Sequence, residues 1–417
     1  MRLRFLSPSI KRALQAAILG ATGLLIHLFS PAALALSPED TRHLLERTAF
    51  GGSTALHEKL RPLTRAQAVD VLLNASGKRS PFPTFSLRDS QNTPQQRKQW
   101  RKEGQQLKQW WIEEMFTSSN PLQERMALFW HGHFTSSLQK VKSPQYMAQQ
   151  NQLFYELGLG DFERLLKAIA KNPAMLVYLD GRANDKNSPN ENFARELLEL
   201  FTLGEGRYTE ADIKAAARAF TGWSVNKNGD FIFRKHQHDD GLKTFLGHTG
   251  SFNGEDILDI LLQQPQCARW IIERLWLSFI SPEPNPTQVN RWASDLQKHW
   301  QIKPILQQLL TSEDFWSPTH RYVLVKSPIE LTLSSWHDVK SQTSPPWPAL
   351  WRLQKQWGQD ILMPPNVKGW PGGLSWLDNE RLTRRQAFVN RFFGQHTPRQ
   401  EALILGGFKN SAQYQLK

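Results

Sequence analysis

The 417-residue chain contains a single cysteine, Cys267, so it cannot form an intramolecular disulfide bond. Cys267 lies in an apolar helical context with Trp270 and Ile271, where a thiol is more often a small buried hydrophobe than a catalytic nucleophile. A domain without disulfides must rely on its hydrophobic core for stability. This chain is long enough to bury such a core.

Several motifs of well-known enzyme classes are also missing. The sequence has no Gly-x-Ser-x-Gly elbow, no Gly-x-x-x-x-Gly-Lys phosphate loop, no His-Glu-x-x-His and no Cys-x-x-Cys. The chain therefore gives no support for the common hydrolase, nucleotide-binding or haem-attachment classes.

Acidic residues are comparatively scarce, with 38 against 51 lysines and arginines, for a net charge of +13. The basic residues are spread along the chain, and we expect no nucleic acid as a partner. The densest run of basic residues comprises Arg97, Lys98, Arg101, Lys102 and Lys108. Its simplest explanation is a solvated basic helix, and contact with an anionic envelope polymer or a membrane surface is the functional alternative. Most of the 16 tryptophans should lie in the core, and exposed ones could stack on sugars.

The first 35 residues have the pattern of a secretory signal peptide. A basic start precedes the apolar segment 13–29, and the small-residue site Ala33-Leu34-Ala35 follows. We expect cleavage near Ala35 and export to the periplasm or the extracellular space, with an uncleaved membrane anchor as the alternative. Cleavage would lower the net charge to +9, because the segment holds four basic residues and no acidic one.

Helical patterns dominate the rest of the chain. Ser37 and Ser327 each begin a cap-proline-acid pattern, and Thr209 with Asp212 forms another capping pair. One strand pattern stands out at Asn228-Gly229, which predicts a β-hairpin near residues 223–235. The sequence therefore predicts a mainly α protein, with one multi-helix domain over residues 36–395 and a C-terminal tail over 396–417. Two irregular segments are expected at residues 76–96, as a surface excursion, and at 363–376.

The stretch 188–223 packs helix start and stop patterns around many charges. Ser188 and Glu191 predict a capping box, and Gly204 predicts the end of that helix. Glu191, Arg195 and Glu199 follow one another at i+4 steps and could form a surface ladder of ion pairs. Glu196 lies at the edge of the apolar face, where partial burial would raise the pKa of its carboxyl towards that of a general base. A buried pair with an arginine is the structural alternative.

Three histidines are the candidate metal ligands. His131 and His133 would point the same way in an extended segment, and His238 follows the predicted hairpin. If these groups meet, their nitrogen atoms suit a transition metal such as Zn. Packed or hydrogen-bonded histidines are the simpler explanation.

Two polar loops carry further candidates for substrate binding. Asp180 lies in a loop between two expected helices, where functional residues often occur. Lys368 and Trp370, with Trp376, could hold an anionic group beside a stacked sugar, and an internally packed loop is the alternative.

Seven segments together carry a family resemblance. They are Leu44–Gly51, Phe129–Phe134, Asn172–Leu176, 188–223, Lys243–Gly247, Val325–Leu331 and Pro364–Gly373. These segments resemble a bacterial family catalogued as domain of unknown function 1800. The resemblance covers nearly the whole chain after residue 35 and implies an exported, mostly helical bacterial protein. Such proteins are often encoded beside a second exported family, domain of unknown function 1501, which resembles the sulfatase and phosphatase superfamily. The family has no agreed catalytic residues that could be transferred.

The leading functional hypothesis is a cell-envelope protein that acts on, or binds, an anionic or carbohydrate polymer. In an enzymatic form, a metal held by the histidines would activate water, with Glu196 as the base. The alternative is a non-catalytic scaffold for an exported partner, such as a protein of the 1501 family.

Overall fold

The computed structural model describes residues 35–86, 93–226, 228–338 and 344–393. These residues form a mainly α-helical protein with two small antiparallel hairpins, as the sequence predicts. Residues 1–34 of the predicted signal peptide and the predicted tail 396–417 lie outside the described residues. No helix within the described ranges is both long enough and apolar enough to cross a membrane.

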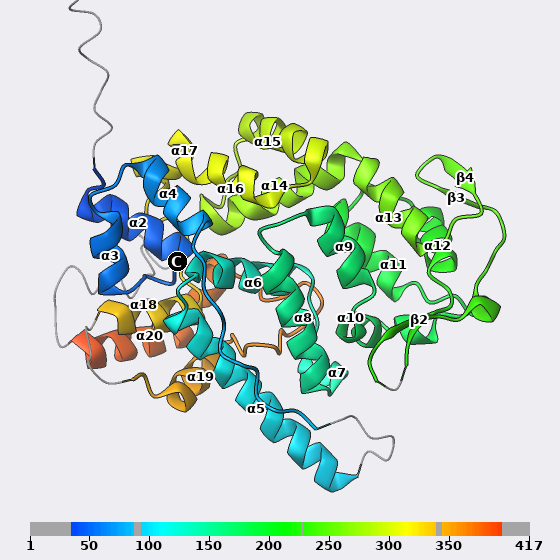
Figure 1. Ribbon diagram of the computed structural model, residues 1–417, viewed down its shortest axis with the longest axis horizontal. Helices are drawn as coiled ribbons and strands as arrows, with labels where there is room; N and C mark the ends of the chain where they lie inside the picture. Colours follow the sequence, from blue (N-terminus) through cyan, green and yellow to red (C-terminus); the bar gives the residue numbers. More distant parts are fainter. Residues whose placement is uncertain (1–34, 87–92, 227, 339–343, 394–417) are drawn as a thin grey trace, which may run out of the picture.

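The first half of the chain contributes α6 in the middle of the view, the long α5 that extends towards the bottom, and further helices to the left and right (Figure 1). They are α2 (Pro38–Thr48), α3 (Thr54–Leu60), α4 (Arg65–Leu73), α5 (Pro94–Thr117), α6 (Pro121–His133), α7 (Leu138–Val141), α8 (Pro144–Leu157), α9 (Phe162–Ala170), α10 (Pro173–Tyr178), η1 (Gly181–Ala183), α11 (Asn192–Glu196), η2 (Leu197–Thr202) and α12 (Glu210–Ala219).

The second half begins with the hairpins and continues as helices that pack along the upper and lower left parts of the view in Figure 1. It comprises β1 (Trp223–Val225), β2 (Phe231–Phe233), η3 (Lys235–Gln237), β3 (Lys243–Phe245), β4 (His248–Gly250), α13 (Gly254–Gln263), α14 (Pro265–Phe279), α15 (Pro286–His299), α16 (Ile302–Thr311), α17 (Glu313–Trp316), η4 (Pro318–His320), α18 (Pro328–Asp338), α19 (Trp347–Gln356), η5 (Gly373–Leu377) and α20 (Asn379–Phe393).

Three predicted helix starts are confirmed by their hydrogen bonds. The hydroxyl of Ser37 accepts from the backbone N–H of Asp40 at 2.9 Å. Thr209 and Asp212 form a reciprocal capping box at the start of α12. Ser327 and Glu330 do the same before α18, with the Ser327 N–H donating to the carboxylate of Glu330 at 2.8 Å. Each cap satisfies backbone groups that have no partner within the helix.

The capping box predicted at Ser188 is wrong. Helix α11 begins at Asn192, and the Asn190 side chain accepts from the Asn192 N–H at 2.9 Å, while Ser188 pairs with Asp185 in an isolated β-bridge. The helix then continues as the π-helix η2, so the backbone N–H of Leu203 donates five residues back, to Leu198. The predicted end at Gly204 is confirmed, because Gly204 takes a left-handed conformation directly after this turn.

The predicted hairpin is present, with β1 paired to β2, but its loop is longer than two residues. The strands end at Val225 and resume at Phe231, and the Asn226 N–H donates to the Asp230 carbonyl at 2.9 Å. A second hairpin, β3–β4, was not expected. Its two turn residues, Leu246 and Gly247, both have positive φ, and leucine is a poor sequence indicator of such a turn.

Most buried apolar side chains form one contiguous core that runs from Leu36 to Leu362. A smaller cluster joins α18 to α20 through Leu331, Trp357, Phe388 and Val389. The segment 363–376 is irregular up to η5, as predicted, and packs closely on the end of α6. A Cβ at Gly369 would lie 2.7 Å from the Gly132 carbonyl, so this approach requires glycine.

Candidate functional site

The structure does not bring the three candidate metal ligands together. Helix α6 continues through Gly132 to His133, so His131 and His133 lie about 200° apart around the helix. His238 follows η3 near the hairpins at the right of Figure 1, whereas α6 lies in the middle of the molecule. Within the described ranges, no group of three or more His, Cys, Asp or Glu side chains is placed to hold a metal ion. The three histidines therefore do not form the predicted metal site.

Each histidine instead has a packing role or a hydrogen-bonding role. His131 is buried among aromatic rings, with the Trp111 and Trp370 centroids both 5.5 Å from its own. His133 Nε2 lies 3.0 Å from the Phe201 carbonyl, and His238 Nδ1 lies 2.9 Å from the Thr221 carbonyl. Burial lowers the pKa of His131 and His133 to about 3, so both are neutral at physiological pH.

Glu196 is half-buried at the junction between α11 and the π-helix. Burial, followed by the neighbouring Glu199 carboxylate, raises the pKa of the Glu196 carboxyl. Among the described residues, its side chain forms no hydrogen bond or ion pair, so the arginine pair considered as an alternative is absent. Arg195 pairs with Glu191 and Glu210, and Glu199 instead accepts a hydrogen bond from Tyr208. The role of Glu196 as a general base stays a prediction.

Of the loop candidates, the structure places one beside Glu196. Lys368 Nζ lies 2.9 Å from Glu205 and 3.7 Å from Glu199, and its charge also acts on Glu196. Trp370 packs against His131, and its indole Nε1 is buried without a hydrogen-bond partner. Asp180 is paired with Lys140 at 2.6 Å and accepts from the Asn192 side chain. Lys368 is thus already paired with carboxylates, and Asp180 with a lysine and an amide donor. Neither side chain is free to contact a substrate without breaking these interactions.

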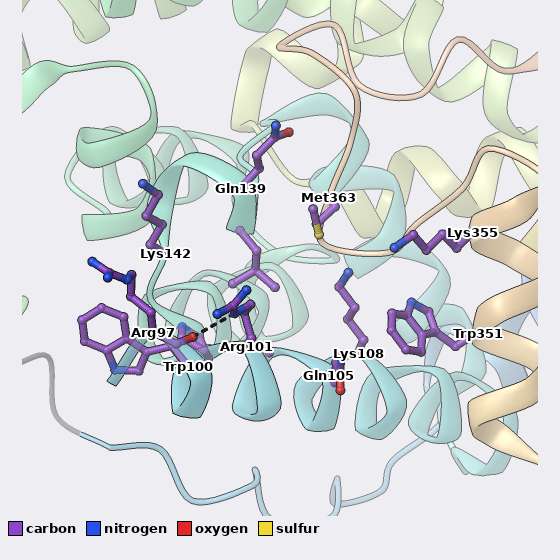
Figure 2. Close-up of a pocket in the computed structure, with 13 residues that line it drawn as sticks. Arg97, Trp100, Arg101, Gln105, Lys108, Gln139, Lys142, Trp351, Lys355 and Met363 are labelled. Carbon is purple, nitrogen blue, oxygen red and sulfur yellow. Dashed lines mark hydrogen bonds between the residues drawn. The ribbon is translucent and has the colours of Figure 1, made fainter. Parts of the chain in front are cut away.

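A different region combines cationic and aromatic side chains around a groove of about 530 Å³, within the size range of small-molecule sites. One wall is a face of α5, and the others come from α7, the start of α8, α19 and Met363. Figure 2 shows Trp100 and Trp351 at opposite ends of a row of cationic side chains. The cations that line the groove are Arg97, Arg101, Lys108, Lys142 and Lys355.

Asp360 is the counter-ion for one end of this row. Its carboxylate lies 2.6 Å from Lys108 Nζ and 3.8 Å from Lys355 Nζ, and it accepts from the Trp351 indole at 2.8 Å. Burial lowers the pKa of Lys108, although Asp360 opposes that shift. The other end differs, because Arg101 and Lys142 form no ion pair within the described ranges. Arg101 donates to the Arg97 carbonyl at 3.3 Å, which leaves its charge uncompensated.

Two backbone features shape the floor and rim of the groove. Lys142 ends α7 with φ +53°, a left-handed conformation that a lysine adopts at a cost and that often marks functional positions. Gly104 lies inside α5, where glycine lowers helix stability by about 1 kcal/mol relative to alanine. A Cβ there would only reach normal contact with Leu138 and Pro144, at 3.5 and 3.9 Å. The missing side chain at Gly104 therefore leaves space at the bottom of the groove, and it is not needed to avoid a clash.

Sequence reasoning found half of this groove. The run on α5 was noted, but its simplest explanation was a solvated helix, and only Arg97, Arg101 and Lys108 face the groove. Their spacing of four and seven residues puts them on one helix face, and this spacing was the available indication. Lys142, Trp351 and Lys355 come from distant segments, and no local pattern connects them to α5.

A comparison with known families matches residues 43–415 to the family described as "Protein of unknown function (DUF1800)". The chain belongs to this family. The match extends past residue 395, so it includes most of the segment predicted to be a tail. No curated protein and no solved structure matches the chain.

Proposed function

We propose that this DUF1800 protein is exported and binds an anionic carbohydrate polymer in the groove along α5. The observation that carries the proposal is a row of cations, with Arg101 and Lys142 lacking a carboxylate partner among the described residues, between two tryptophans. Cations attract carboxylate or sulfate groups, and indole faces stack on sugar rings. Both kinds of side chain line the groove.

The length of the row favours a polymer over a small anion. Arg97 and Lys108 are 11 residues apart on α5, which corresponds to about 16 Å along the helix axis. One small anion cannot contact both ends, whereas a chain with a charge on successive sugars can. Cations and aromatic rings also suit single-stranded nucleic acid. The predicted signal peptide favours the carbohydrate, because export would place the groove among envelope polymers.

The test is binding of the mature chain to polygalacturonate, measured by calorimetry. Methyl-esterified polygalacturonate is the matched neutral ligand, and single-stranded DNA is the competing polyanion. The groove variant is Arg101→Gln with Lys142→Gln. The matched control is Lys98→Gln with Lys102→Gln. It also removes two positive charges, both from α5, but leaves the groove lining intact.

The proposal expects binding of the acidic polymer, little binding of the ester, and a loss of affinity of at least about tenfold in the groove variant alone. Equal weakening in both double variants would mean that only net charge matters. Tighter binding of DNA than of any acidic polysaccharide would also contradict the proposal. If the mature chain bound no polymer but repeatedly co-purified with one exported protein, that result would instead support the scaffold hypothesis.

A further inference from the structure

A second cavity, of about 380 Å³, lies between α2, α6, α14, the start of α18 and the loop 370–376. Four of the segments that carry the family resemblance contribute to its wall. They supply Arg47, Phe129, Lys326 and Trp370, among others. Segments that are far apart in sequence, and that identify the family, therefore meet at this cleft rather than at the groove on α5.

The charges in the cleft do not balance. Two carboxylates line it, and each already has a partner: Glu46 lies 3.1 Å from Lys326, and Glu330 lies 3.2 Å from Arg125. Two further guanidinium groups, those of Arg47 and Arg274, line the same cleft. Neither forms an ion pair or a hydrogen bond with the residues that the structure describes. The cleft thus has an excess of two positive charges.

The unsatisfied polar atoms in the wall are all hydrogen-bond donors. Arg47 Nε, Arg125 Nε and the indole Nε1 of Trp370 are buried and have no acceptor among the described residues. Arg125 is only 8% exposed. One of its terminal nitrogens donates to the Ser278 hydroxyl at 3.0 Å, so the unsatisfied atom is its Nε. Buried polar groups normally have partners, so three orphaned donors around one cavity indicate a missing acceptor.

Burial makes the unpaired arginines costly in the absence of a ligand. Desolvation lowers the pKa of Arg47 to about 10 and also lowers the pKa of Arg274. Arg47 therefore stays charged at neutral pH. It forms no direct ion pair with the described residues, and the nearby carboxylates of Glu46 and Glu330 favour its charged form. An uncompensated buried charge lowers stability, and stability is often given up in this way at functional sites.

The loop opposite the arginines leaves space for a ligand. Gly372 and Gly373 have φ of +67° and +54°, and a Cβ at either position would meet no atom within 4 Å. They let the backbone approach a ligand closely. Tyr322, another wall residue, has φ +61°, a strained conformation for a tyrosine that is often found at functional sites.

We propose that this cleft binds a phosphate or sulfate group through Arg47, Arg125 and Arg274. These arginines come from three helices, α2, α6 and α14, and all three line the cleft. This arrangement suits the oxygens of a tetrahedral group better than a planar carboxylate. The cavity is in the size range of small-molecule sites, which leaves room for the molecule that carries the group.

The test measures the thermal stability of the mature chain, and its dissociation constants, with inorganic phosphate and inorganic sulfate at constant ionic strength. Glucose 6-phosphate and glucose 6-sulfate distinguish an ester from a free anion, and glucose is the neutral control. The variants are Arg274→Gln and, separately, Arg47→Gln. The matched control is Arg269→Gln, which removes one charge from α14 outside the cleft, where Arg269 pairs with Glu273.

Either cleft variant should weaken binding of the anion by at least about tenfold, and the control should not. Without ligand, Arg274→Gln should be as stable as the wild-type chain or more so, because it removes a half-buried cation that has no ion-pair partner among the described residues. If Arg274 had only a structural role, the ligand-free variant would be less stable than the wild-type chain. Tighter binding of the esters than of the free anions would identify an esterified ligand, and the reverse order a free anion.

The inference is overturned if no phosphate or sulfate compound stabilises the wild-type chain beyond chloride. It is also overturned if the ligand-free Arg274→Gln and Arg47→Gln variants are both destabilised and bind as tightly as wild type. The groove proposal is tested with different variants and a polymeric ligand, so either proposal can fail alone.

Discussion

Replacing Arg79 should remove one of the strongest single contacts in the fold. Arg79 belongs to the segment before α5 and forms two hydrogen bonds with the Glu124 carboxylate of α6, both at 2.6 Å. A third donor reaches Asn151 of α8 at 2.8 Å, and Glu124 also accepts from the Trp111 indole of α5. This pair therefore connects α5 and α8, which line the groove, with α6, which lines the cleft.

The magnitude follows from burial. The side chains of Arg79 and Glu124 are 6% and 0% exposed, so Arg79→Leu leaves a carboxylate in the interior without its counter-ion. Breaking a buried pair in this way costs about 3–5 kcal/mol. Replacing both residues by leucine should cost clearly less than the sum of the two single changes, because no buried charge is then left unpaired.

The assay is urea denaturation at neutral pH, with the free energy of unfolding determined for both single variants and the double variant. Lys78→Leu is the matched control, because the neighbouring Lys78 is exposed, and it should change stability by less than about 0.5 kcal/mol. A cost below about 1 kcal/mol for Arg79→Leu, or additive costs in the cycle, would refute the reasoning.

Three further predictions concern single residues. His131 is neutral in the fold because burial lowers its pKa to about 3, whereas the unfolded chain takes up a proton near pH 6.5. Stability is therefore lost as the pH falls below that value, and His131→Phe should reduce the loss between pH 7 and 5 by about 2 kcal/mol in urea titrations. An unchanged pH dependence would show that His131 is not buried as described. Gly369→Ala should cost about 1–3 kcal/mol in the same assay, because its φ is +82° and its Cβ would meet the Gly132 carbonyl; a neutral result would mean that the loop is not packed on α6. Cys267 is buried and burial raises its pKa, so Ellman's reagent should label it only after unfolding, and rapid labelling of the native chain would contradict that burial.

Local patterns predicted the helices well, because caps and apolar periodicity are encoded by residues close together in the chain. Ser37, Thr209 and Ser327 all begin helices as expected. The extended segment considered for His131 and His133 is wrong, because α6 continues to His133 and both histidines are buried in its packing. Tertiary contacts outweighed local propensity there.

The segment before α5 shows the same limit. Its polar composition predicts a surface excursion over residues 76–96, and residues 76–86 are mostly exposed. The Arg79 side chain is nevertheless buried, and the backbone N–H groups of Ser80 and Ser86 donate to carboxylates of α5. Residues 87–92 lie outside the described ranges. An arginine with a buried partner cannot be recognised from composition, because the partner is 45 residues away.

Both proposed sites depend on long-range assembly in the same way. The groove combines α5 with Lys142 and with Lys355 of α19, and the cleft combines arginines from three helices. From net charge and tryptophan content, the sequence suggested an anionic or carbohydrate ligand, and this stays a prediction. It could not show which of its 51 lysines and arginines lack partners, because pairing is set by the packing of distant elements.

The most direct test of the central claim is the salt dependence of oligogalacturonate binding by the mature chain and its groove variants. If the groove cations contact the ligand, affinity falls as the salt concentration rises. The slope of log affinity against log salt should then be shallower than in the wild-type chain by about one in each single variant, Arg101→Gln and Lys142→Gln. Lys98→Gln should keep the wild-type slope. The same slope in all four proteins would contradict the account, because the ligand would then be bound elsewhere.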